Sequence, residues 1–329
     1  MSDGTANNTL PRLTQPAAQL TMVLFIGLVS AKDVRVHATD TFSGLWIPLV
    51  TPFHNDAVDH TALRKLVQHL VPQGITGIVV CGSTGEAAAL SADEQLAVLD
   101  TVAQAAPGLP LVMGLSGYHL PDTLDWVRTL STRRLAGLLV PAPHYIRPSQ
   151  AGLVQWFTAI AEASTQPVLI YDIPARTGAQ LALATLRTLA QHTNITAIKD
   201  CGGDPAKTQA LIADGQLQVL AGDDANIFTT LALGGRGAIA ASGHVHTARL
   251  VALMQHVQRG ELAAAQVLWR PLLPLIDALF SEPNPGPLKA LLAHQGLMQA
   301  ELRAPMTKAS TGLTERLVAL SASLELSPR

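Results

Sequence analysis

The chain has 329 residues, of which 48% are hydrophobic and 14% are charged, so it can bury a large core. A formal net charge of −2 gives no basis for binding nucleic acid or another polyanion. The two cysteines, Cys81 and Cys201, exclude a disulfide framework. Few cysteines are typical of a reducing compartment, so we expect a cytoplasmic protein with no membrane or nucleic-acid partner.

The first 40 residues differ from the rest of the chain. Residues 21–31 are apolar but too short to span a bilayer, and Arg12 is the only basic residue before them. We expect residues 1–40 to be a poorly ordered N-terminal extension, with a targeting segment as the alternative.

From residue 45 onward, short apolar runs alternate with stretches that have helical periodicity. In residues 60–71, leucines and a valine recur at the spacing of one helix face. Ser91 and Glu94 form a capping-box pattern at the start of a helix predicted over 91–104, and a further helix is predicted over 149–163. The eight apolar runs, each predicted to be a strand, occupy residues 45–53, 77–81, 109–115, 137–140, 167–172, 195–199, 217–221 and 237–241.

Strands that alternate with helices pair in parallel, and eight such units close a barrel. An open doubly wound sheet is the alternative, but no Gly-x-Gly-x-x-Gly follows the first strand. We therefore predict an α/β fold, a (β/α)8 TIM barrel over residues 41–261. Residues 262–329 are predicted to form a C-terminal helical domain, interrupted by the proline-rich segment 282–287. The helices expected after the last strand are 247–258, 261–281, 287–295 and 312–325.

Lys199 stands at the end of the sixth apolar run, on the face expected to point inward with Ala197 and Ile195. Burial lowers the pKa of a lysine, and a neutral amine is a nucleophile suited to forming a Schiff base with a ketone. The alternative is a lysine at a strand end that pairs with Asp200.

In a closed α/β barrel, functional groups lie on the loops after the strands. Residues 82–86 (Gly-Ser-Thr-Gly-Glu) can hold a carboxylate with amides and hydroxyls, although an ordinary Gly-Ser turn has the same composition. Tyr145 and Tyr171, two of only three tyrosines, stand at the ends of the fourth and fifth strands, and a phenol can relay protons. Arg176 offers a fork for a second carboxylate, or is a surface arginine at a turn.

Two further pairs of residues are weaker candidates for a functional site. His244 and His246 form a His-x-His pattern, but no third ligand stands at suitable spacing, so we expect no metal. Cys81 and Cys201 are expected to be small core residues.

Taken together, the motifs resemble the class I pyruvate-dependent aldolases of the dihydrodipicolinate synthase and N-acetylneuraminate lyase superfamily. The resemblance covers about residues 42–310. It implies no cofactor, and it implies condensation of pyruvate with the small aldehyde L-aspartate-4-semialdehyde to 4-hydroxy-tetrahydrodipicolinate, in lysine and diaminopimelate biosynthesis. The motifs that carry it are Gly82-Ser83-Thr84-Gly85-Glu86, Tyr171 with Pro174, Arg176 and Gly178, Ile198-Lys199-Asp200, Leu220-Ala221-Gly222-Asp223-Asp224 and Glu282-Pro283-Asn284-Pro285.

The resemblance implies four catalytic residues. Lys199 is similar to the Schiff-base lysine, and Tyr171 to the proton donor and acceptor beside the imine. Ser83 stands where the family usually has threonine and would pass protons between Tyr171 and Tyr145. Tyr145 is similar to a tyrosine that crosses a dimer interface into the neighbouring site, which implies a homodimer or homotetramer.

The resemblance also implies four substrate-binding residues. Thr84 is similar to the residue that binds the pyruvate carboxylate, and Ile239 to one that lines the pyruvate site through its backbone carbonyl. Arg176 is similar to the arginine that binds the semialdehyde carboxylate. Gly222, from the motif at the end of the seventh strand, is also expected to be a substrate-binding residue.

Several positions depart from the family pattern. Asp172 replaces an asparagine, Asp200 a glutamate and Gly286 an aliphatic residue, and residues 242–244 replace a more asparagine-like strand ending. These departures leave a second function open, a pyruvate aldolase or lyase for N-acetylneuraminate or a 2-keto-3-deoxy sugar acid. A third is an inactive binding or regulatory relative. The positions that match a lysine-inhibition site in the family are Ala92, Tyr118, Asp122 and His144, and we expect weak or absent inhibition by lysine.

Overall fold

The computed structural model describes residues 1–4 and 41–325. Most of the extension expected at residues 1–40, with its apolar stretch at 21–31, lies outside the described residues.

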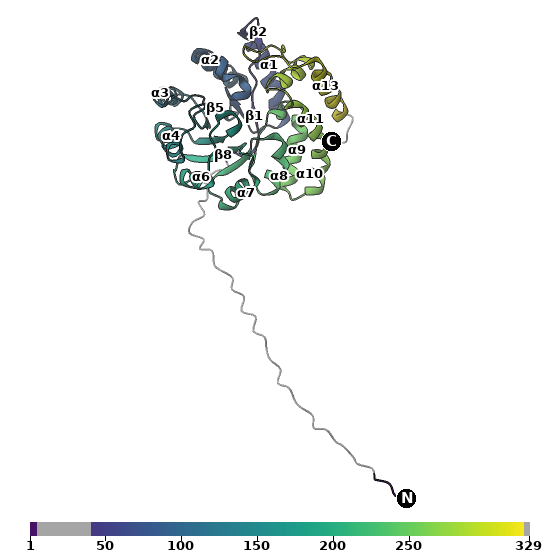
Figure 1. Cartoon of the computed structure of the whole chain (residues 1–329). Helices are drawn as coiled ribbons and strands as arrows, with labels where there is room; N and C mark the ends of the chain where they lie inside the picture. Colours follow the sequence, from purple (N-terminus) through teal and green to yellow (C-terminus); the bar gives the residue numbers. More distant parts are fainter. Residues whose placement is uncertain (5–40, 326–329) are drawn as a thin grey trace. The chain divides into compact units, whose positions relative to one another are not determined.

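Eight parallel strands close into a barrel, which confirms the predicted fold (Figure 1). The strands are apolar along their length because the barrel interior covers one face and helices cover the other. Around the barrel, the strands are β1 (Gly44–Pro48), β10 (Gly237–Ile239), β9 (Gln218–Ala221), β8 (Ile195–Asp200), β7 (Val168–Asp172), β6 (Gly137–Pro141), β5 (Leu111–Gly114) and β4 (Gly77–Val80).

A small antiparallel hairpin is present that the sequence did not lead us to expect. The run predicted as one strand over 45–53 ends at Pro48 and resumes as β2 (Phe53–His54), which pairs with β3 (Ala57–Val58). Asn55 and Asp56 both have positive φ, 52° and 62°, as a two-residue hairpin turn requires.

The helices predicted between the strands are present. The four leucine and valine positions of the first helix are fully buried, and the capping box forms at the second, with Ser91 N donating to Glu94 over 2.9 Å. The helices are α1 (His60–Leu70), α2 (Ala92–Ala105), α3 (Leu120–Leu130), α4 (Gln150–Ala163), α5 (Pro174–Thr177), α6 (Leu183–Leu189), α7 (Pro205–Asp214) and α8 (Ile227–Ala232).

Five α-helices follow the last strand in the part of the chain that the structure describes. The helix expected over 261–281 is divided into α10, a 3-10 turn and α11, because Pro271 and Pro274 lack an amide hydrogen. This stretch (Leu262–Leu279) could cross a membrane by length and apolarity alone, but 44% of it is buried inside the fold, as in the core helix of a globular protein. The division of the chain between residues 261 and 262 stays a prediction. The five are α9 (Thr247–Gln258), α10 (Leu262–Trp269), α11 (Leu273–Leu279), α12 (Gly286–His294) and α13 (Thr311–Glu325).

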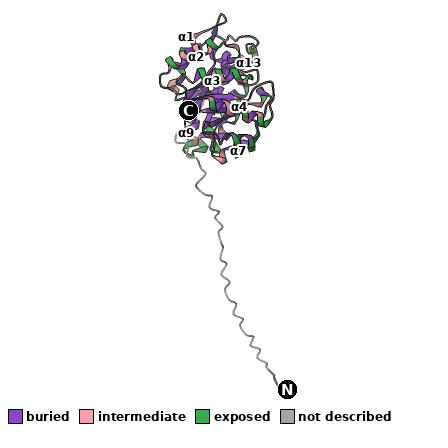
Figure 2. Ribbon diagram, turned by 90° about the vertical axis from the view of Figure 1, so that its left-hand side faces the viewer, coloured by how far each residue is buried: buried purple, intermediate pink, exposed green. Residues whose placement is uncertain are grey.

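The buried residues form two clusters. The larger one lies between the strands and the helices, and the smaller one fills the barrel interior. Figure 2 shows the buried residues inside the ring of helices and the exposed residues on its outer surface. Tyr171 is a member of the interior cluster, so the strand ends near it border the filled barrel. The interior cluster is Phe42, Trp46, Val79, Val112, Leu139, Leu169, Tyr171, Ala197, Leu220 and Ile239.

A buried ion pair joins the loop after β4 to α12. Glu86, at the end of the Gly-Ser-Thr-Gly-Glu motif, binds the ammonium of Lys289, which is fully buried. Lys289 also donates to the carbonyl of Glu301 over 2.8 Å, and its Nζ lies 4.3 Å from the ring centre of Phe53. Burial lowers the pKa of Lys289 although the carboxylate of Glu86 opposes that shift. The pair fastens the loop that carries Ser83 to the C-terminal helices.

We expect Lys289→Met to destabilise the fold by about 3–5 kcal/mol, because it leaves the Glu86 carboxylate buried without its partner. The double variant Glu86→Gln, Lys289→Met should recover much of that loss. Chemical denaturation measures both, with the exposed Lys65→Met as control. Equal losses in the single and the double variant would contradict the importance of the pair.

Candidate active site

The pairing of β7 with β8 places Tyr171 directly opposite Lys199. The Nζ of Lys199 lies 4.3 Å from the centre of the Tyr171 ring, and both side chains are buried, at 4% and 7% exposure. Ala197, two residues before the lysine, faces the barrel interior as expected. Ile195 faces the helices instead, because the register with β7 shifts by one residue after Val168.

Asp200 does not pair with Lys199. Its carboxylate accepts from the hydroxyl of Thr208 over 2.5 Å and from the amide of Gly202 over 2.9 Å. The alternative interpretation of Lys199, as the ion-pair partner of Asp200, is therefore wrong. The carboxylate of Asp200 and the ammonium of Lys199 point to opposite faces of β8, as the side chains of successive strand residues do.

Asp172 also faces away from the site. Its carboxylate forms a buried ion pair of 2.5 Å with Lys207 on α7, and Lys207 donates in addition to the carbonyl of Leu181 over 3.2 Å. Burial raises the pKa of Asp172 while the hydrogen bond and charge of Lys207 lower it. Neither Asp172 nor Asp200 lines the cavity next to Lys199. These two departures from the family pattern therefore belong to the packing of α7.

Two adjoining cavities open at the ends of the strands. The deeper cavity, of about 250 Å³, is lined by Lys199 together with Thr84, Gly222 and other residues at strand ends. The outer cavity is about 370 Å³ and reaches to His144 and Met306. Both are bordered by Ser83, Tyr171, Ile173, Arg176 and Asn284.

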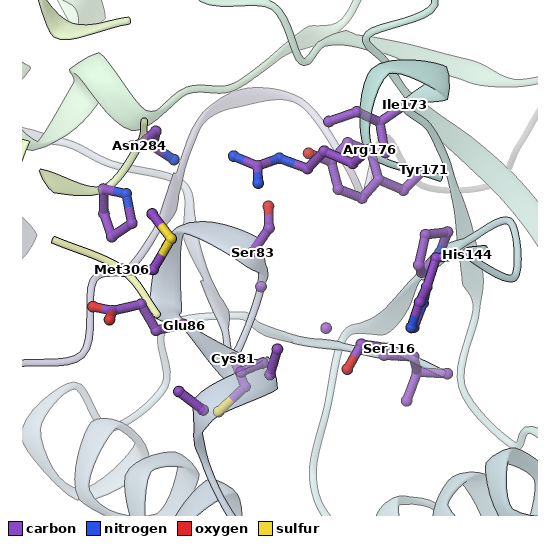
Figure 3. Close-up of a pocket in the computed structure, with 18 of the residues that line it drawn as sticks. Cys81, Ser83, Glu86, Ser116, His144, Tyr171, Ile173, Arg176, Asn284 and Met306 are labelled. Carbon is purple, nitrogen blue, oxygen red and sulfur yellow. The ribbon is translucent and has the colours of Figure 1, made fainter. Parts of the chain in front are cut away.

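Figure 3 shows how the polar groups meet in the outer cavity. The guanidinium of Arg176 extends into the space between Ser83 and Asn284, beside the ring of Tyr171. Arg176 comes from the short helix α5 and Ser83 from a 3-10 turn after β4. Asn284, from the Glu-Pro-Asn-Pro segment, donates to the hydroxyl of Thr84 over 3.0 Å. A hydroxyl-bearing turn, a phenol and an arginine thus border both cavities, and Lys199 lines the deeper one.

The electrostatics of Lys199 differ from the expectation of a neutral amine. Burial by itself lowers the pKa of Lys199, but interactions with Tyr171, Cys201 and the carboxylate of Asp224 outweigh burial, and the net direction is upward. Burial raises the pKa of Tyr171, opposed by Lys199 and by hydrogen bonding with Ser83. The free site therefore holds an ammonium beside a neutral phenol, and Lys199 must lose a proton before it can attack.

Four further residues of the sequence analysis lie outside the two cavities or at the edge of one. Tyr145 is 86% exposed and lines neither cavity, with a φ of 73°. Ile239 is fully buried in the interior cluster. Cys201 packs against the interior cluster and borders the Lys199 cavity, and the buried Cys81 borders the outer cavity. Burial raises the pKa of each thiol to about 12.

Gly222 is needed for the lysine to fit. A Cβ at this position would lie 2.6 Å from Cγ and 2.9 Å from Cε of Lys199. Two contributors were missed at the sequence level although their motifs were noted, Asp224 in the deeper cavity and Asn284 next to Thr84. Their positions could have identified them: Asp224 lies shortly after the end of an apolar strand, and Asn284 lies within the proline-rich break between two helices.

The two histidines of the His-x-His pattern have separate structural partners. His244 is buried, its Nε2 accepts from the amide of Val50 over 3.2 Å, and its Nδ1 therefore carries the proton and donates to the carbonyl of Ala241 over 2.8 Å. His246 lies 3.0 Å from the hydroxyl of Ser321. Both rings are thus used in packing within the described part of the chain.

Comparison with known proteins decides the family. The model of the dihydrodipicolinate synthetase family matches residues 41–323. This chain belongs to that family. The 4-hydroxy-tetrahydrodipicolinate synthase 2 of Clostridium acetobutylicum is 34% identical over 278 residues, which are 83% of this chain and 97% of that protein. The synthase of Thermosynechococcus vestitus is 37% identical over 283 residues, 84% of this chain and 96% of the relative.

Solved structures of synthetase family members superimpose on the barrel. The dihydrodipicolinate synthase of Thermotoga maritima has a TM-score of 0.84 and 29% identity, and covers 87% of this chain and 99% of its own. The enzyme of Acinetobacter baumannii, solved with pyruvate, has a TM-score of 0.83 and 30% identity, with 86% and 99% covered.

The positions that match the lysine-inhibition site of the family lie together. Ala92, Tyr118 and Asp122 line a further cavity of about 640 Å³, and His144 packs edge-on against Tyr118 with ring centres 5.4 Å apart. A synthase of the family from Cyanidioschyzon merolae has been solved with lysine bound. For this chain, weak or absent inhibition stays a prediction.

His244 predicts a pH dependence of stability. Burial lowers its pKa from 6.5 to about 4, so the unfolded chain takes up a proton that the fold does not. The stability from the neutral ring is complete above pH 6.5 and is lost as the pH falls toward 4. Between pH 7.5 and pH 5, His244→Gln should therefore lose about 2 kcal/mol less than the wild type. Urea unfolding at both values tests this, with the exposed His69→Gln as control, and parallel losses in all three proteins would contradict it.

Proposed function

We propose that the chain is a 4-hydroxy-tetrahydrodipicolinate synthase that condenses pyruvate with L-aspartate-4-semialdehyde in lysine and diaminopimelate biosynthesis. The observation that carries the proposal is the burial of Lys199 against Tyr171 in a cavity that also holds a hydroxyl-bearing turn and an arginine. The names of the relatives support the same reaction.

The first half of the reaction is the activation of pyruvate. Lys199 gives up a proton, its amine attacks the ketone carbon, and the ketone oxygen leaves as water after protonation. Tyr171, hydrogen bonded with Ser83, is placed to carry these protons to and from the reacting atoms. Thr84 and the amides of its turn suit the pyruvate carboxylate, and Asn284 holds the Thr84 hydroxyl in position.

The second half is carbon–carbon bond formation in the outer cavity. Loss of a methyl proton turns the imine into an enamine, whose carbon attacks the aldehyde carbon of the second substrate. Arg176 offers its planar fork to the carboxylate of that substrate. The amino group of the semialdehyde then attacks the imine carbon, and Lys199 leaves as the free amine, which closes the ring and releases the product.

The wall of the outer cavity favours this acceptor over a sugar. Much of the wall is apolar, from alanines after β4 together with Leu139, Pro141, Ile173 and Met306. A polyhydroxylated acceptor would leave many hydroxyls without hydrogen-bond partners against such a wall. The lyase for N-acetylneuraminate or a 2-keto-3-deoxy sugar acid is therefore the weaker alternative, and an inactive binding relative is the third.

We further propose that the enzyme is cytoplasmic, needs no cofactor or metal, and works as a homodimer or homotetramer. Tyr145, 86% exposed, and Ile146, 51% exposed, form an aromatic and apolar tip next to the outer cavity residue His144. In a dimer, Tyr145 would enter the neighbouring site and complete the proton relay that begins at Tyr171. A monomeric dihydrodipicolinate synthase variant among the solved relatives is described as the first of its kind, which supports assembly as the rule.

Borohydride reduction in the presence of pyruvate should attach the three-carbon acid to Lys199 and to no other lysine. Peptide mass spectrometry locates the adduct. Lys199→Arg should give no adduct and no measurable turnover, whereas the exposed Lys65→Arg should behave as the wild type. A wild-type protein that gives no adduct on Lys199 would exclude the whole aldolase class.

Arg176→Lys should lower kcat/KM for aspartate semialdehyde by about tenfold to a hundredfold, equivalent to the roughly 1.5–3 kcal/mol of a charged hydrogen bond. The rate of trapping with pyruvate alone should change little, because Arg176 acts on the second substrate. Steady-state kinetics with aspartate semialdehyde, N-acetylmannosamine and glyceraldehyde measure acceptor choice. Faster turnover of either sugar aldehyde by the wild type would favour the lyase alternative.

A further inference from the structure

We propose that the buried carboxylate of Asp224 is the counter-ion of Lys199, and that it serves both the free ammonium and the protonated imine formed with pyruvate. This inference rests on the proposed Schiff-base function and adds a residue to it.

The end of β9 brings Asp224 to the lysine. β9 pairs with β8 so that Leu220 lies opposite Lys199, and the backbone then passes the lysine stem at Gly222. Asp224 follows two residues later and lines the same cavity of about 250 Å³. It is 3% exposed. After this close passage at Gly222, a buried carboxylate thus lines the same cavity as the buried Lys199.

Two backbone amides hold the carboxylate in place. The amide of Ser242 donates to Oδ1 over 2.6 Å, and the amide of Ala241 donates to Oδ2 over 3.4 Å. Because both oxygens accept N–H donors, the contacts favour the ionised form. Burial raises the pKa of Asp224 above its ordinary value, and the hydrogen bonds to Ser242 and the charge of Lys199 oppose that rise. Both donors come from the segment after β10, so the carboxylate cannot turn away without losing them.

The other titratable or charged groups around Lys199 are poorer counter-ions. Among the described residues that line the deeper cavity, these are Tyr171 from β7, Cys201 after β8, Arg176 from α5 and Asp223 after β9. Burial keeps the thiol and the phenol protonated, with the pKa of Cys201 raised to about 12. Arg176 has the same charge as the lysine. Asp223 is exposed and its oxygens accept from the amide of Ala225 and the side chain of Asn226, at 3.3 and 3.1 Å.

One fixed anion is enough to stabilise the site both before and after the imine forms. An ammonium and a ketone give a protonated imine and water, so one positive charge is present before and after the carbon–nitrogen bond forms. A carboxylate that stabilises the first species also stabilises the second. It keeps the imine protonated, which is the form that readily loses a methyl proton to become the enamine. Tyr171 then stays free to transfer protons.

The test is the pH profile of trapping with pyruvate and cyanoborohydride, which reduces the protonated imine. The rising limb reports deprotonation of Lys199, and the falling limb reports deprotonation of the imine. Without the carboxylate both positive forms lose stability, so Asp224→Asn should move both limbs to lower pH by about one to three units. Asp224→Glu keeps the charge and should stay near the wild-type profile. Asp223→Asn, which removes an exposed carboxylate two residues after Ala221, should also stay there.

A profile of Asp224→Asn that coincides with the wild type would overturn the proposal and leave Asp224 as an anchor for residues 241 and 242. If Asp224→Asn does not fold, the smaller neutral Asp224→Ser gives the same readout. The outcome is distinct from a failure of the proposed function, because in that case the wild type itself forms no adduct on Lys199. That result would overturn both proposals together.

Discussion

The parallel register of β7 against β8 is the constraint on which the site depends. It sets Tyr171 opposite Lys199 on the inner face, and it sets Asp172 opposite Asp200 on the outer face. The first turn of α7 fastens both outer residues, since Lys207 binds Asp172 and Thr208 binds Asp200. The residue that follows each inward-facing side chain is therefore fixed to the same helix. A shift of one residue between these strands would exchange the inner and outer sets.

The close approach of α7 also explains a glycine. A Cβ at Gly202 would lie 2.6 Å from Oδ2 of Asp172 and 2.6 Å from Nζ of Lys207. Only a residue without a side chain lets the chain pass beside this buried pair. A comparable close passage occurs at Gly222 beside the stem of Lys199. Two glycines thus make room for the two lysines, one that holds the strands and one that is proposed to bind the substrate.

The site is better described as charge-balanced than as apolar. Burial alone would release the proton of Lys199, but the carboxylate of Asp224 and the neighbouring phenol and thiol act in the opposite direction. Similar balance appears around the other buried cations, with Lys207 beside Asp172 and Lys289 beside Glu86. Each buried lysine of the barrel therefore has a carboxylate in contact or in the same cavity, which is the usual condition for keeping a charge out of water.

The sequence predicted the barrel and much of the site because both follow from local patterns. Apolar runs that alternate with helical stretches give the strand order, and the strand-end rule brings Ser83, Tyr171, Arg176 and Lys199 together. What it could not predict depends on contacts distant in the chain. The partner of Asp172 is 35 residues away on α7, and the pKa of Lys199 depends in part on Asp224, from the 3-10 turn after β9.

Other misses have equally physical causes. The helix expected over 261–281 is interrupted by prolines, and the turn at Asn55 and Asp56 was too short to register as a hairpin. The role of Tyr145 stays a prediction, because its proposed partner is a second copy of the chain. To predict such features, one must know either how the chain packs in three dimensions or how its copies assemble.

A crystal structure of the protein soaked with pyruvate tests the central claim most directly. The account predicts continuous electron density from Nζ of Lys199 to the ketone carbon of pyruvate, with the carboxylate against Thr84 and the methyl group toward the outer cavity. Density for pyruvate joined to Lys207 or Lys289, or bound without a covalent link while Lys199 stays free, would contradict it.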